Sequence, residues 1–360
     1  MAGMTYRELI DCRTITLMER HPNAVLFGVG VGDGVKDIFG TTTAARERFP
    51  GRVWDTPLSE NMLTGAAVGM AAEGMLPIIV HARADFLTLA MEHLVNSAAK
   101  WSFVHPGETL PMIVRAIIGR GWGNGPTHTQ APVAWFANTP GIDVWMPVST
   151  NGLDMAYLSA LRGPRIIFEH RSLYDREPIP DPLYDVGGEL RGGHRRGVRW
   201  TADQEIRRAA PLGPGDKGWL RPTIHLIGFS AGALDLDAAA QILFANGVRS
   251  FVQVVESMEF FKVTSSRHPR LIVDVGQMTA GLSAEIMAQH SSARDHYEIK
   301  RIGPPPWPCP ASAPLEQAWY ATHGPEAIAN AAGQMLGVEV DVSKGPERVD
   351  AGIGGIRGPF

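Results

Sequence analysis

Short, nearly continuous apolar runs alternate with helical patterns through the first half of the chain. This alternation is typical of a parallel sheet whose two faces are both covered by helices. We therefore expect an α/β domain over residues 1–175. The apolar runs predict strands at residues 24–31, 76–81, 112–118, 142–146 and 165–169. The helical patterns predict helices at residues 5–20, 60–73, 86–100 and 152–161.

The periodic pattern is lost between residues 176 and 222, where Gly, Pro and Arg dominate, so we interpret this stretch as an insertion or linker. A second, smaller α/β domain is expected over residues 223–345. The Gly-rich residues 346–360 are expected to form a tail. The second domain has predicted strands from residue 223 and at 251–255, 271–275 and 297–301, and predicted helices at 234–245 and 283–289.

Composition and charge exclude several classes of protein. The 360 residues are 44% hydrophobic and 19% charged, which is usual for globular domains with their own cores. A net charge of −4 creates no field that would attract nucleic acid or an anionic membrane, and no apolar stretch is long enough to span a membrane. Cys12 and Cys309 predict neither a disulfide framework nor a metal site. We expect a cytoplasmic protein without nucleic-acid or membrane partners.

The first segment with candidate chemistry is residues 52–74. A strand and a turn lead to Ser59, which is placed to cap a helix that has Glu60 in its first turn. An acid at this position is also favoured by the helix dipole alone, without a chemical role. Gly65 and Gly69 each cost the helix about 1 kcal/mol relative to Ala, so we expect a second helix, within the subunit or across an interface, to cross closely and to bury Glu60.

Two further segments carry candidate side chains. Phe86 follows the predicted strand 76–81 and, taken alone, is an ordinary core residue. His128 lies in a Gly-rich loop after the strand 112–118. An isolated loop histidine is more often simply exposed, so the residue types alone leave both interpretations open.

In their order along the chain, these segments resemble the beta-type subunit of the thiamine-diphosphate-dependent, decarboxylating component of 2-oxoacid dehydrogenases. The matching stretches cover about residues 5–175. The resemblance implies a transketolase-like pyrimidine-binding domain with a parallel sheet, followed by a smaller α/β domain of the transketolase C-terminal type. It is carried by DTPLSE before a small-residue helix, ADF before VNSAAK, HTQAPVAWFANTPG, PVSTNGLDMAYLSAL, IIFEHRSLY and the later GPPPWPCPASAPLEQ.

The resemblance also assigns roles to single residues. The family's pyrimidine-binding glutamate falls on Glu60, its ring-packing aromatic on Phe86, its active-site histidine on His128 and a cofactor-contacting apolar position on Leu58. A carboxylate against the pyrimidine ring nitrogen stabilises the tautomer that activates the cofactor. Both Glu60 and His128 are therefore expected to be catalytic.

The sequence departs from the family at the end of the strand 76–81, where an acidic residue is usual. This chain has Val80 there, so we expect His81 and Arg83 to line an altered substrate pocket.

Gly32-Asp33-Gly34 matches the start of the metal-diphosphate motif of thiamine enzymes, and Asn61 lies near the expected distance. The second Asn of the motif is missing, and Asn61 belongs to the Glu60 segment. We interpret the match as chance and predict no metal site in this chain.

The implied cofactor is thiamine diphosphate, with Mg²⁺ held mainly by a partner. That partner is an alpha-type subunit that binds the diphosphate, in a 2+2 heterotetramer. The leading hypothesis is decarboxylation of a 2-oxoacid with transfer of the acyl or aldehyde unit to lipoamide, which adds a lipoyl acyltransferase as a partner. The alternatives are a two-subunit transketolase-like or acyloin-forming carboligase with an aldehyde acceptor, and a non-catalytic paralogue.

Overall fold

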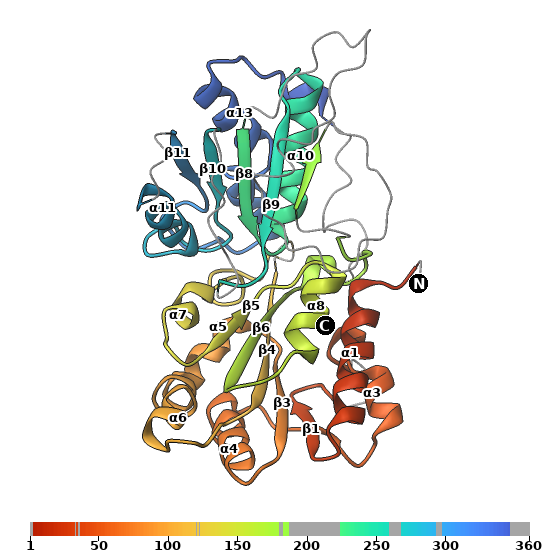
Figure 1. Ribbon diagram of the computed structural model, residues 1–360. Helices are drawn as coiled ribbons and strands as arrows, with labels where there is room; N and C mark the ends of the chain where they lie inside the picture. Colours follow the sequence, from red (N-terminus) through yellow and green to blue (C-terminus); the bar gives the residue numbers. More distant parts are fainter. Residues whose placement is uncertain are drawn as a thin grey trace, which may run out of the picture.

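Six parallel strands form the sheet of the N-terminal domain, in the order β2-β1-β3-β4-β6-β5 (Figure 1). The structure, a computed structural model, describes residues 3–32, 34, 37–119, 121, 123–179, 183–186, 224–258, 268–292 and 297–345. The strands are β1 (Ala24–Gly28), β2 (Val53–Asp55), β3 (Leu76–His81), β4 (Met112–Ile118), β5 (Asp143–Trp145) and β6 (Pro164–His170). Every residue of β1, β3, β4 and β6 is buried, which confirms the predicted two-sided cover.

The helices of this domain lie on the two faces of the sheet because alternate strand residues point in opposite directions. Leu26 and Ile78 share a core with α1 and α8, whereas Phe27 and Ile79 share the other core with α4, α5 and α7. The helices are α1 (Tyr6–Arg20), α2 (Asp37–Gly40), α3 (Thr43–Arg48), α4 (Glu60–Ala72), α5 (Ala84–Leu87), α6 (Trp101–Val104), α7 (Val133–Ala137) and α8 (Thr150–Leu158), with a short 3₁₀ turn η4 (Arg171–Leu173) after β6.

The predicted continuous helix over residues 86–100 is wrong in detail. The chain instead passes through α5, the 3₁₀ turn η1 (Thr88–Ala90), the π-helix η2 (Glu92–Ser97) and the 3₁₀ turn η3 (Ala98–Lys100). This segment packs closely against a distant part of the chain. Gly141 lies so near the backbone of Ala99 that a Cβ built on it would be 2.0 Å from the Ala99 carbonyl oxygen. Such contacts between distant segments leave no trace in local periodicity.

The C-terminal domain has its own five-stranded sheet, in the order β11-β10-β8-β9-β7. Its strands are β7 (Leu183–Val186), β8 (Ile224–Phe229), β9 (Ser250–Val255), β10 (Arg270–Val273) and β11 (Ile299–Ile302). Its helices are α10 (Gly232–Ala245), α11 (Leu282–Ser292), α12 (Ala313–Ala321) and α13 (Pro325–Leu336), followed by the 3₁₀ turn η5 (Val342–Lys344).

Strand β7 lies within residues 176–222, and the interpretation of this stretch as an insertion or linker stays a prediction. The strand pairs antiparallel with β9 and forms one edge of the second sheet. Four residues are too few for a periodic signal, so the strand is defined by its pairing. The rest of residues 180–223 and the expected tail at residues 346–360 lie outside the described residues, and the proposed domain boundaries stay a prediction. Within the described residues, none of the helices is long and apolar enough to cross a membrane.

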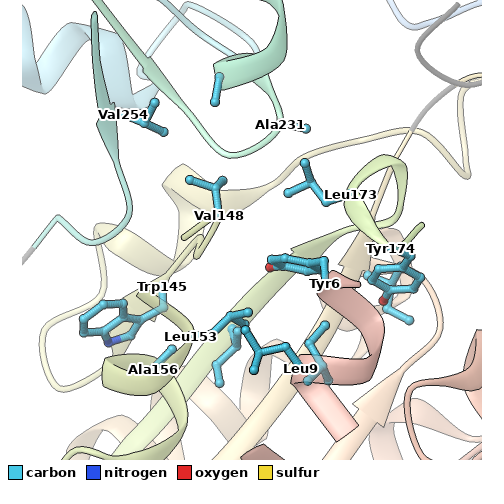
Figure 2. Close-up of a cluster of buried hydrophobic side chains, with 14 of the residues drawn as sticks. Tyr6, Leu9, Trp145, Val148, Leu153, Ala156, Leu173, Tyr174, Ala231 and Val254 are labelled. Atoms are coloured by element: carbon cyan, nitrogen blue, oxygen red, sulfur yellow. The ribbon is translucent and has the colours of Figure 1, made fainter. Parts of the chain in front are cut away.

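The two domains share one hydrophobic core at their junction. Figure 2 shows Ala231 and Val254 of the C-terminal domain facing Val148 and Leu173 of the N-terminal domain. A carboxylate reinforces this contact: Glu256 accepts hydrogen bonds from the backbone N–H groups of Val148 (2.7 Å) and Ser149 (2.8 Å), directly before α8. The junction therefore fixes the C-terminal domain against the loop that follows β5.

A buried ion pair stabilises the centre of the N-terminal domain. The Arg115 guanidinium on β4 donates to both carboxylate oxygens of Glu169 on β6, at 2.7 and 2.9 Å, and neither side chain is exposed. The hydroxyls of Tyr157 and Tyr174 donate to the same carboxylate, and Thr41 accepts a further hydrogen bond from Arg115. With all these partners in place, the charges are compensated despite their complete burial.

Substitution Glu169→Ala should lower the free energy of unfolding by about 3–5 kcal/mol, because it leaves the Arg115 charge buried without its carboxylate. The control Glu19→Ala breaks an exposed ion pair with Arg48 and should cost less than about 1 kcal/mol. Urea unfolding followed by circular dichroism measures both. Equal losses in the two variants would contradict the stabilising role of the buried pair.

Candidate active site

The predicted site residues lie at one edge of the N-terminal sheet. Glu60 begins α4 directly after β2, Phe86 lies in α5 after β3, and His128 follows β4. Because the strands are parallel, their carboxyl ends share one edge, where ligands of open α/β sheets bind. The edge formed by these carboxyl ends is the candidate active site.

Direct contacts join the segments that carry Phe86 and His128. Their rings meet edge to face, with centroids 5.1 Å apart and planes at 84°. The neighbouring Asp85 carboxylate accepts from the Gln130 backbone N–H (3.1 Å) and side-chain amide (3.0 Å). Burial raises the pKa of Asp85, and these hydrogen bonds oppose the shift. Asp85 and Gln130 were not predicted as site residues, although their positions next to Phe86 and close to His128 in the sequence could have indicated them.

The Glu60 segment joins this group through Asn61, whose side-chain amide donates to the Leu89 carbonyl at 3.1 Å. Among the described residues, Glu60 makes no hydrogen bond or ion pair with His128 and no hydrogen bond with Phe86. Ser59 occupies the N-cap position as expected, but its side chain makes no capping hydrogen bond. The predicted N-cap position is therefore right, but the predicted hydrogen bond from the helix to the Ser59 hydroxyl is absent.

Glu60 is half-buried in the single chain, so no helix of this subunit buries it completely, and burial across an interface stays a prediction. The close neighbour exists further along α4: a Cβ on Gly65 would lie 2.9 Å from the His93 ring, whereas nothing lies within 4 Å of one on Gly69. Leu58 is 76% exposed beside Glu60. The start of α4 and the residues just before it thus leave the acid partly accessible beside an exposed apolar side chain.

His81 lies beneath this helix rather than at the surface. It ends β3, is 2% exposed, and its Nε2 is 3.1 Å from the Thr64 hydroxyl, which itself donates to the Glu60 carbonyl at 2.9 Å. Since the hydroxyl proton is used on Glu60, Nε2 of His81 is the donor. Burial lowers the pKa of His81 to about 4, so the ring is neutral at physiological pH. His81 supports the Glu60 helix, and its role in the substrate pocket stays a prediction.

Arg83 is also buried, and it lies between charged groups. Burial lowers its pKa, while Asp85, Tyr174 and Glu316 raise it. Arg171, which follows β6 at the same edge, lies with its guanidinium 3.8 Å from the Phe39 ring centroid; burial and the nearby Arg83 lower its pKa to about 10. Arg171 was missed, although its place directly after a buried strand could have indicated it.

The chance match at Gly32-Asp33-Gly34 is only partly covered by the structure, because Asp33 lies outside the described residues. Asn61 is engaged with Leu89 and lies 3.4 Å from the His93 ring nitrogen. Within the described part of the chain, no group of three or more His, Cys, Asp or Glu side chains is arranged to hold a metal.

A large open groove of about 1130 Å³ lies elsewhere, between the two domains. Trp101, Thr139 and Arg165 line one side of it, and Glu285 and Gln289 of α11 line the other. It contains none of Glu60, Phe86 and His128. This groove is therefore a different place from the edge that carries the candidate catalytic residues, and cavity size alone would not have indicated that edge.

The comparisons with known proteins agree with the fold. Residues 2–177 match the family model described as the transketolase pyrimidine-binding domain. The solved structure of a split-gene transketolase, described as an inactive beta4 tetramer, has a TM-score of 0.62 at 16% identity and covers 94% of this chain and 99% of that one. The fold is therefore that of a transketolase-like α/β protein, as predicted.

Curated relatives narrow this class. The chain is 30% identical over 283 residues to the pyruvate dehydrogenase E1 component subunit beta of Porphyra purpurea, covering 74% of this chain and 77% of the relative. It is 31% identical over 182 residues to the acetoin:2,6-dichlorophenolindophenol oxidoreductase subunit beta of Cupriavidus necator, covering 47% of this chain and 54% of the relative. The chain belongs to the family of E1 beta subunits of thiamine-diphosphate-dependent 2-oxoacid dehydrogenases, which confirms the resemblance seen in its sequence. The chain spans about half the length of several other curated relatives that it matches.

The buried, neutral state of His81 predicts a specific pH dependence of stability. The unfolded chain protonates His81 below about pH 6.5, whereas the folded chain does so only near pH 4. The unfolded state binds more protons in this window, so the contribution of His81 is complete above about pH 6.5 and falls by about 3 kcal/mol towards pH 4.

Replacement His81→Gln keeps a donor for Thr64 and removes the titration. Urea unfolding between pH 4 and 7 should give a shallower loss of stability in this variant than in the wild type. Identical slopes in the two proteins would show that His81 is not held neutral in the folded state.

Proposed function

We propose that this chain is the beta subunit of a two-subunit thiamine-diphosphate enzyme that decarboxylates a 2-oxoacid and transfers the acyl or aldehyde unit to lipoamide. The observation that carries the proposal is that Glu60, Phe86 and His128 all follow strands at the carboxyl edge of the sheet, where the Phe86 and His128 rings are in contact. Packing alone does not require these three side chains at one edge. This combination also argues against a non-catalytic paralogue.

The residues present fit the pyrimidine end of the cofactor. The half-buried Glu60 carboxylate makes no hydrogen bond or ion pair with the other described residues, so it is available to accept one from a ring nitrogen. Exposed Leu58 offers an apolar contact beside it, and Phe86 supplies an aromatic ring. When bound, thiamine diphosphate supplies the electron sink that decarboxylation of a 2-oxoacid requires.

His128 is placed to hold or move a proton at the substrate. Its Nδ1 lies 2.9 Å from the Thr127 hydroxyl, and the edge-to-face contact with Phe86 sets the plane of the ring. Nε2 is the ring nitrogen left for the substrate. A positioned histidine of this kind orients a bound carboxylate or donates a proton to the acceptor.

The surface around Glu60 supports a partner subunit. Leu58, Met62 and Leu89 are 76%, 50% and 56% exposed, and they belong to the two segments joined by the Asn61–Leu89 hydrogen bond. Covering these side chains would also bury Glu60, which gives its carboxylate the dry surroundings that strengthen a hydrogen bond to the cofactor. We infer an alpha-type subunit in a 2+2 heterotetramer, which holds most of the Mg²⁺ and diphosphate contacts. A lipoyl acyltransferase would be a further partner.

A second candidate keeps the same chemistry at Glu60 but uses an aldehyde acceptor, as in transketolase-like or acyloin-forming enzymes. It is favoured by the pair of buried arginines, Arg83 and Arg171, near the position where the family usually has an acidic residue. We propose a cytoplasmic location, which the two free cysteines fit because disulfides are rare in a reducing compartment.

Substitution Glu60→Gln should lower kcat for CO₂ release by about 10²- to 10⁴-fold, because the amide replaces the charged acceptor for the ring. The assay uses the chain co-purified with its alpha-type partner, thiamine diphosphate, Mg²⁺ and a panel of 2-oxoacids. Glu73→Gln, at the exposed far end of α4, is the matched control and should keep wild-type activity.

The same assay separates the two candidates when lipoamide and short aldehydes are offered in turn. Product formed with lipoamide supports the leading proposal, and carboligation only with an aldehyde supports the second. Equal activity of wild type and Glu60→Gln would exclude the proposed role of Glu60.

A further inference from the structure

The loop that carries His128 is anchored by a residue of the other domain. Glu316 lies in the first turn of α12 and is completely buried. Its Oε1 accepts a hydrogen bond from the Gly121 backbone N–H at 2.9 Å, and its Oε2 accepts one from the Gly123 backbone N–H. One carboxylate therefore satisfies two backbone donors of the loop after β4.

Further contacts hold the same loop against the segment before α12. Ser312 donates its backbone N–H to the Gly123 carbonyl at 3.1 Å, and Asn124 forms a β-bridge with Ala311. A Cβ built on Gly123 would lie 2.4 Å from the Ala313 nitrogen, and its φ of +66° also favours glycine. The backbone of the loop is thus in direct contact with the backbone of the segment that precedes α12.

The other end of the loop is held from within the N-terminal domain, through Asp85 and Gln130. Arg83 links the two ends electrostatically, because both Asp85 and Glu316 raise its pKa. His128 lies between the two anchored ends, and its ring packs against Phe86. Either anchor alone would leave one side of a Gly-rich loop free to change conformation.

We propose that Glu316 is a positioning residue, which fixes the loop from the C-terminal domain so that His128 keeps its edge-to-face place beside Phe86. The inference rests on the proposed function for the catalytic role of His128. A buried carboxylate is suited to this task, since its hydrogen bonds to backbone N–H groups are charge-assisted and their loss leaves buried donors unsatisfied.

Glu256 provides a matched control within the same chain. It also belongs to the C-terminal domain and also accepts two backbone N–H groups of the N-terminal domain, from Val148 and Ser149. Those donors follow β5, whereas the His128 loop follows β4. If the glutamates only hold the domains together, substituting either one should reduce activity to a similar extent. If Glu316 positions His128, only the substitution of Glu316 should do so.

The experiment compares Glu316→Gln with Glu256→Gln in the chain co-purified with its partner subunit. Hydrogen–deuterium exchange by mass spectrometry measures the peptides covering residues 119–132, and steady-state CO₂ release gives kcat and KM. In Glu316→Gln we expect exchange in this loop to rise about tenfold or more and kcat to fall about 10- to 100-fold, with a smaller change in KM. Glu256→Gln should leave both near wild type.

Unchanged loop exchange and kcat in Glu316→Gln would overturn the proposal. Equal losses of kcat in both variants, with matching falls in melting temperature, would overturn it as well, because they indicate a weakened junction. If the wild type shows no thiamine-diphosphate-dependent activity, the proposed function fails. The exchange comparison then still decides whether Glu316 anchors the loop.

Discussion

The common direction of the six N-terminal strands is the constraint on which the site depends. Parallel strands place all their carboxyl ends at one edge, so side chains that follow β2, β3 and β4 lie along the same edge although they are far apart in the sequence. Burial on both faces requires the apolar runs that make these strands. Glu60, Phe86 and His128 thus owe their proximity to the same pattern that forms the core.

The edge is completed from outside the sheet. On one side the C-terminal domain supplies two carboxylates to backbone N–H groups of the N-terminal domain. Glu256 binds donors that follow β5, and Glu316 binds donors that follow β4. On the other side Met62 of α4 and Leu58, just before the helix, are exposed and form the surface that we assign to the partner subunit. In this account the chain provides a pre-formed pair, Phe86 and His128, and an acid whose burial awaits assembly.

Sequence reasoning was most successful where local pattern and structure coincide. The predicted bounds of β3 and β4 match the observed strands, because continuous apolar runs and buried parallel strands have the same length. Glu60, Phe86 and His128 follow β2, β3 and β4 in the structure, and their role as a site stays a prediction. The nature of each contact was less accessible: Ser59 sits at the cap position without capping, and Glu60 remains half-buried.

Residues that act across long sequence separations could not be predicted. Glu316 and Gly121 are 195 positions apart, and nothing in the helix start around Glu316 distinguishes it from an acid favoured by the helix dipole. Strand β7 depends in the same way on its pairing with β9. The role of His81 was also hidden, because its neutral state is set by burial beneath α4.

The most direct test is an experimental structure of the chain bound to its alpha-type partner, thiamine diphosphate and Mg²⁺. The account predicts the Glu60 carboxylate within hydrogen-bond distance, about 2.6–3.2 Å, of a pyrimidine ring nitrogen, with Phe86 against the ring and the partner covering Leu58. A cofactor bound elsewhere, or a Glu60 that stays open to solvent in the assembled complex, would contradict it.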